Sequence, residues 1–177
     1  MRAALFLLFL GCSSDRVNAC SAVGSDPCVT FHLTAEPALV DALITSVAMW
    51  VTYDVFGSVR NQLVQTQMRA ATHFPIAVGL DLPSGLTASA KIRIEALAGP
   101  GPAGYRVVTV SPMAAQHLDQ DVMMVRQELS GCFDNTREPA ETDLDCGGDC
   151  PPCNSGRHCV GSGDCQSAVC LGSATCE

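Results

Sequence analysis

Cysteine is the residue type whose number and spacing could do the most chemistry in this chain of 177 residues, which contains 11 of them. Eight lie between residues 132 and 177: Cys132, Cys146, Cys150, Cys153, Cys159, Cys165, Cys170 and Cys176. So dense a set is typical of exported proteins, because the cytosol keeps thiols reduced. Since this segment has few large apolar side chains, we predict that disulfides, each contributing about 2–4 kcal/mol, replace a hydrophobic core there.

Two other chemistries compete for the same cysteines. Cys146, Cys150 and Cys153 have a spacing that could ligate zinc. Cys150-Pro-Pro-Cys153 has the form of a redox C-x-x-C pair. Oxidising conditions disfavour zinc, and a redox pair needs a thioredoxin-like βαβ setting that this segment lacks. We therefore predict disulfides, with no cofactor.

Calcium is a further possibility beside a tight turn. Asp143, Asp145 and Asp149 surround Gly147 and Gly148, and carboxylates are the hard oxygen ligands that calcium takes. The alternative is that these side chains cap turns by accepting hydrogen bonds from backbone N–H groups. The sequence leaves calcium binding open, and we assign no metal ligand.

The N-terminus has the features of an export signal. Residues 3–10 are uninterruptedly apolar after Arg2, too short for the ~20 residues that span a bilayer and long enough for a signal peptide. Phe9-Leu10-Gly11-Cys12 resembles the lipobox of bacterial lipoproteins. The resemblance implies that residues 1–11 are a cleaved signal peptide and that Cys12 carries the lipid.

The alternative is an ordinary signal peptide, which would leave Cys12 as a free thiol on a secreted protein. Parity favours lipidation, because without Cys12 ten cysteines remain and all can pair. Ser13 follows in place of the aspartate that retains enteric lipoproteins in the inner membrane, so the resemblance implies the outer membrane. Residues 12–28 are predicted to form a tether, in which Cys20 and Cys28 close a loop by a disulfide.

The part that must position these segments lies in residues 29–130. Residues 43–53 fit either a helix or a strand, and we favour a strand because strands separated by turns flank them. Alternation of apolar and polar residues predicts the other strands at 29–34, 59–68, 76–82, 90–96, 105–110 and 122–129. Seven strands in about 100 residues predict a mainly β domain, an antiparallel β-sandwich.

Two family resemblances extend this prediction. The strand pattern, with an Ile92-Arg-Ile-Glu-Ala-Leu97 strand near its end, resembles the Ig-like or transthyretin-like domains of bacterial surface lipoproteins. Residues 131–177, the cysteine-rich module, contain Glu141-Thr-Asp-Leu-Asp-Cys-Gly-Gly148. This resembles the "ETDxDCGG" core of a small disulfide module of secreted bacterial proteins, found beside adhesive or hydrolytic domains. Neither resemblance implies a chemical activity.

Other patterns predict no catalytic site. Residues 99–104 match G-x-G-x-x-G, but two prolines remove backbone donors and a strand follows, so they predict a hairpin turn. The histidines, His32, His73, His117 and His158, are scattered, and each is expected to be a surface or strand residue. Trp50 could anchor a ligand, but such a tryptophan is expected in the core. The net charge is −8, and residues 132–177 carry eight acidic and two basic side chains, which disfavours nucleic-acid binding.

These observations predict a non-catalytic, exported, lipid-anchored surface protein of the outer membrane. Its partners would be the membrane, through Cys12, and an extracellular protein or polysaccharide bound for display or adhesion. The alternatives are a calcium-stabilised spacer and an accessory module of a secreted hydrolase.

Overall fold

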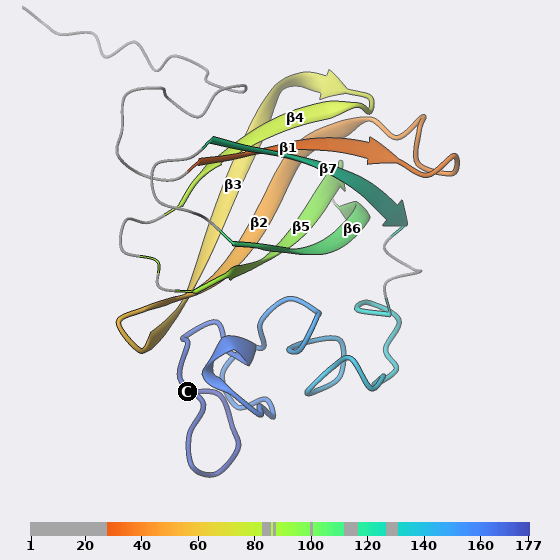
Figure 1. The fold of residues 1–177 in the computed structure, drawn as a ribbon. Helices are drawn as coiled ribbons and strands as arrows, with labels where there is room; N and C mark the ends of the chain where they lie inside the picture. Colours follow the sequence, from red (N-terminus) through yellow and green to blue (C-terminus); the bar gives the residue numbers. More distant parts are fainter. Residues whose placement is uncertain (1–27, 83–85, 87, 100, 112–116, 127–130) are drawn as a thin grey trace, which may run out of the picture.

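The computed structural model describes residues 28–82, 86, 88–99, 101–111, 117–126 and 131–177. The predicted signal peptide, Cys12, Cys20 and nearly all of the predicted tether lie outside these residues. The described part is mainly β (Figure 1). Its elements are the strands β1 (Cys28–Ala35), β2 (Ile44–Val55), β3 (Ser58–Thr72), β4 (Ile76–Asp81), β5 (Ala90–Ala98), β6 (Gly101–Val110) and β7 (His117–Arg126), and the 3-10 turn η2 (Ser162–Asp164).

The strands form one sheet that curls into a half-barrel, in the order β3-β2-β5-β6-β7-β1-β4 (Figure 1). Every neighbouring pair is antiparallel except β1 and β7, which are parallel. The prediction of a wholly antiparallel sandwich is therefore corrected to a mixed, curled sheet. Alternation specifies which side chains face the core, but not which strands become neighbours. The parallel pair joins the first strand of the chain to the last, β1 to β7.

The concave side of the sheet holds the hydrophobic core. In β2, Val47, Met49 and Val51 are all buried at 3% exposure or less. This spacing of two confirms the strand and is incompatible with a helix at residues 43–53. Ile92 and Ile94 of β5 enter the same core with the apolar residues of β1, so the isoleucines of the "IRIEAL" pattern face inward.

The bounds of three strands differ most from the prediction, and the first of these is β3, which runs on to Thr72 instead of ending at residue 68. β6 begins at Gly101, so the turn of the G-x-G-x-x-G segment is confined to its start, where Gly99 has a φ of +62°. β7 begins at His117 rather than residue 122; its first half has one half-buried apolar residue, Leu118, among polar ones, so the alternation there is weak. In the described part of the chain, no helix has the length and apolar character needed to cross a membrane.

Candidate functional site

All eight cysteines of the cysteine-rich module form disulfides. The pairs are Cys132–Cys150, Cys146–Cys153, Cys159–Cys170 and Cys165–Cys176. Cys150 and Cys153 bond to other cysteines and not to each other, so the C-x-x-C is not a redox pair in this structure. The same bonds consume the thiolates that a zinc site would need. Cys28 is also disulfide-bonded, and its predicted partner Cys20 lies outside the described residues.

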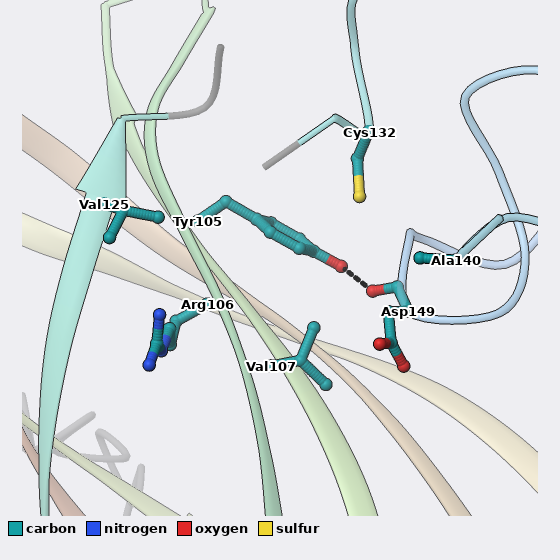
Figure 2. A pocket seen from close by; sticks show the side chains of 7 residues that line it. All are labelled: Tyr105, Arg106, Val107, Val125, Cys132, Ala140 and Asp149. Atoms are coloured by element: carbon teal, nitrogen blue, oxygen red, sulfur yellow. Dashed lines mark hydrogen bonds between the residues drawn. The ribbon is translucent and has the colours of Figure 1, made fainter. Parts of the chain in front are cut away.

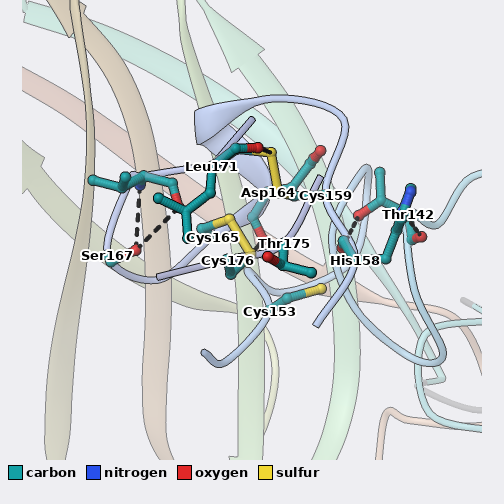
Figure 3. Close-up of a disulfide and its surroundings, with 12 residues drawn as sticks. Thr142, Cys153, His158, Cys159, Asp164, Cys165, Ser167, Leu171, Thr175 and Cys176 are labelled. Carbon is teal, nitrogen blue, oxygen red and sulfur yellow. Dashed lines mark hydrogen bonds between the residues drawn. A yellow bond between two sulfur atoms is a disulfide. The ribbon is translucent and has the colours of Figure 1, made fainter. Parts of the chain in front are cut away.

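Sulfur takes the place of an aliphatic core in this module. Cys153, Cys159, Cys165 and Cys176 are each at most 3% exposed and form one cluster. Figure 3 shows the Cys165–Cys176 bond with Cys153 beside it. The side chains packed against this cluster are again cysteines, Cys146 and Cys170. Cross-linking therefore orders a segment whose apolar burial is too small to do so.

The aspartates proposed for calcium are engaged separately. The carboxylate of Asp143 accepts hydrogen bonds from the backbone N–H groups of Leu144 and His158, both at 2.7 Å. These two bonds, that of His158 first, lower the pKa of Asp143. Arg157 adds an ion pair at 3.6 Å. Asp143 thus caps a turn.

The other two aspartates point to different partners. Asp145 Oδ1 accepts the backbone N–H groups of Asp134 and Asn135, both at 2.9 Å. Asp149 Oδ1 pairs with Lys91 Nζ at 2.9 Å. Each of the three aspartates therefore contacts a different partner in this structure. Among the described residues, the two groups with metal-ligand proximity consist of disulfide sulfurs and a single carboxylate.

Gly147 and Gly148 give the module the loop that meets the sheet. Both have positive φ, +74° and +60°, which side chains disfavour. A Cβ on Gly147 would lie 1.9 Å from Thr142 Oγ1, and one on Gly148 would lie 2.0 Å from the carbonyl oxygen of Ala140. The loop therefore requires glycine at both positions. Asp164 Oδ1 accepts the N–H of Gly148 at 2.9 Å.

Arg93 connects this loop to the sheet. Its side chain is 1% exposed, and its Nη2 donates to the carbonyl oxygen of Gly148 at 2.6 Å. Its Nη1 donates to Thr52 Oγ1 on β2 at 2.7 Å. Burial lowers the pKa of Arg93, and the nearby Tyr105, Asp164 and Asp149 act in the opposite direction. A buried guanidinium thus joins β2, β5 and the module.

Two more contacts fix the module in place. Tyr105 on β6 donates its hydroxyl to the carbonyl oxygen of Asp149 at 2.6 Å (Figure 2). Burial raises the pKa of Tyr105, so the hydroxyl keeps its proton. On β3, Asn61 Nδ2 donates to the carbonyl oxygens of Gly163 and Cys165 around η2. Contacts from three strands, β3, β5 and β6, therefore hold the module against one face of the sheet.

This convex face, which we call the outer face, carries the side chains of β2, β3, β5 and β6 that point away from the core. A pocket of about 280 Å³ opens where it meets the module (Figure 2). Tyr105, Val125, Ala140 and Asp149 are among the residues that line it. Tyr105 packs edge-on against Phe133 with ring centroids 5.7 Å apart.

Trp50 was expected in the core, but it lies on the outer face. It is half-buried, and among the described residues it belongs to none of the buried apolar clusters. Its cross-strand partners are Leu63 on β3 and Arg93 on β5. One step along the sheet, Ala48 lies between Gln65 and Glu95. A tryptophan, an amide and a carboxylate therefore share one region of the outer face.

Glu95 is a polar group of this region that burial affects directly. It is half-buried, and burial raises its pKa. No hydrogen bond or ion pair of its carboxylate is formed within the described part of the chain. A half-desolvated carboxylate without a partner gains stability when a ligand supplies hydroxyl or amide donors.

Sequence analysis did not identify Arg93, Tyr105 or Asn61 as site residues. Alternation placed Lys91, Arg93 and Glu95 opposite the core, but nothing in the sequence indicated that the module would cover part of that face. No protein-family model, curated protein or solved structure matches this chain. The site is therefore interpreted from its own geometry.

Proposed function

We propose that this protein is a non-catalytic, exported surface protein, lipid-anchored through Cys12 in the outer membrane, whose outer face binds polysaccharide. The observation that carries the binding role is Trp50, a half-buried tryptophan outside the described apolar clusters. An indole ring presented on the face of a sheet can stack on the C–H face of a sugar ring. Such a ring supplies affinity, while polar neighbours fix orientation.

The neighbours of Trp50 suit sugar hydroxyls. Gln65 offers both donors and acceptors, and Glu95 offers acceptors. Leu63, 48% exposed, extends the apolar surface beside the indole. Arg93 and Tyr105 hold the module beside this region of the outer face, and Asp149 belongs to the loop that they contact.

Trp50 also supplies the assay, because the chain contains a single tryptophan. We expect its fluorescence to shift when the protein is titrated with the polysaccharide that retains it in a screen of immobilised cell-wall and capsular glycans. Trp50→Ala should lose retention. Phe56→Ala is the matched control, since Phe56 is a more exposed aromatic (84%) at the β2–β3 turn, away from this region.

Two results would contradict the binding role. One is retention by a glycan with no change in Trp50 fluorescence, and the other is equal retention of wild type and Trp50→Ala. Binding of a protein partner in place of every glycan would replace polysaccharide as the ligand. The anchor is tested separately: Cys12→Ser should release the protein from membranes, and mass spectrometry of the mature N-terminus should show acyl chains on Cys12.

A further inference from the structure

The fold brings together two histidines that are distant in sequence. His32 on β1 and His117 on β7 lie on either side of Asp119, all on the outward side of the β1–β7 pair. His32 Nε2 is 3.1 Å from Asp119 Oδ1, and His117 Nε2 is 3.4 Å from the same oxygen. The histidines are scattered in the sequence and these two are exposed strand residues as expected, but the pairing of β1 with β7 brings them to one carboxylate.

The parallel register explains this arrangement. Thr30 lies across from Asp119, and His32 lies across from Asp121. Residues two apart on a strand share a face, so His117, Asp119 and Asp121 follow one another beside Thr30 and His32. Asp121 thus adds a second carboxylate next to the His32 end of the cluster. Only the pairing of β1 with β7 creates this set.

The cluster is accessible to solvent. The side chains of His32, His117 and Asp119 are 46%, 49% and 62% exposed. On the other side of β1, the register partner of His32 is Ala77 and that of Thr30 is Gly79. These small residues on β4 leave the cluster uncovered, so its side chains can adjust around a ligand.

We propose that His32, His117 and Asp119 close around a divalent transition-metal ion of the zinc type, with Asp121 as an additional ligand. The two imidazoles each contact Asp119 but are too far apart to share an ion as they stand, so the exposed side chains must move together on binding. Two imidazoles and one or two carboxylates are a donor set suited to zinc. Binding forms one metal–nitrogen bond at Nε2 of each imidazole. The proton that Nε2 donates to Asp119 leaves to solvent in exchange for one taken up at Nδ1, so each ring stays neutral with its one proton on Nδ1. Each Nε2 then exchanges its hydrogen bond to Asp119 Oδ1 for a bond of about 2.0–2.1 Å to the metal.

The site would join the first strand to the last. β1 and β7 are parallel and have no hairpin between them, so a shared metal adds a link where the chain itself provides none. The metal cannot be held instead by the cysteines of the module, because their sulfurs are in disulfides. Zinc binding by the oxidised protein therefore does not involve the cysteines of the module.

The test is calorimetric titration of the oxidised, tag-free protein with zinc chloride. We expect one site per chain and a rise in Tm on zinc addition. His32→Gln and His117→Gln should each weaken zinc binding at least about tenfold, the lower end of the loss seen when a merely supporting group is removed. His73→Gln is the control, because His73 is exposed and lies outside the cluster. It should bind zinc as the wild type does.

Cobalt(II) provides an independent readout. Its visible spectrum should show nitrogen and oxygen ligands without a thiolate charge-transfer band, and Asp119→Asn should change that spectrum. The substituted side chains are exposed, so circular dichroism of the metal-free variants should match the wild type. The proposal is overturned if no zinc binds, or if His32→Gln and His117→Gln both bind zinc as tightly as the wild type.

Discussion

Replacement of Arg93 tests how the sheet holds the cysteine-rich module. Its guanidinium makes two short hydrogen bonds, to Gly148 and to Thr52, at 1% exposure. Hydrogen bonds from a charged donor contribute about 1.5–3 kcal/mol each. The desolvation of the guanidinium, whose Nε has no partner in the described residues, offsets part of that gain.

We therefore expect Arg93→Ala to lower the free energy of unfolding by about 3 kcal/mol, near the value of two such bonds after this offset. For a protein of this size, 1 kcal/mol corresponds to about 2–4 °C in Tm, which gives a fall of about 6–12 °C. The measurement is thermal unfolding by circular dichroism with the disulfides intact. Hydrogen exchange should show faster exchange of the Gly148 amide.

Lys91 provides the contrast, because it contacts the same loop. Its Nζ donates to the carbonyl oxygen of Gly148 at 3.2 Å and pairs with Asp149, but its side chain is 38% exposed. Exposed ion pairs contribute about 0–1 kcal/mol, so Lys91→Met should change Tm by only a few degrees. Equal effects of Lys91→Met and Arg93→Ala, or a Tm of Arg93→Ala within about 2 °C of wild type, would refute the reasoning.

Three further predictions concern the module. Peptide mapping without reduction should recover the pairs Cys132–Cys150, Cys146–Cys153, Cys159–Cys170 and Cys165–Cys176; any other pairing would contradict the described topology. Gly148→Ala should sharply lower the yield of these pairs on oxidative refolding, because its Cβ would meet the Ala140 carbonyl, whereas Gly172→Ala, with open space around it, should refold normally. Asp143 has a pKa below its ordinary value of 3.8, so its contribution to stability is present above that pH and lost as the pH falls through the folded-state pKa. Asp143→Asn should thus be less stable than wild type at pH 7, with the difference shrinking below about pH 4 in pH-dependent Tm measurements; a constant difference would exclude this role.

Much of the local structure was predictable because it depends on near neighbours. The period-two alternation of Val29, Phe31 and Leu33 identifies a strand wherever that strand goes, and seven strands were expected and found. The dependence of the module on cysteine followed from composition, since too few apolar side chains exist there to order it. Gly147 and Gly148 beside the aspartates indicated a tight turn, which the positive φ angles show.

Only the tertiary structure decided how distant segments are placed next to one another. Nothing local distinguishes Arg93 from an exposed arginine until the module covers it, and Trp50 could not be assigned to the outer face before β2 had its neighbours. His32 and His117 share Asp119 only because β1 pairs in parallel with β7. By itself the sequence determined the strands and the need for cross-links, because these follow from side-chain chemistry and spacing. The sheet order and the covered face depend on which of many possible long-range pairings buries the most apolar surface while satisfying the polar groups, and that balance exists only in the folded chain.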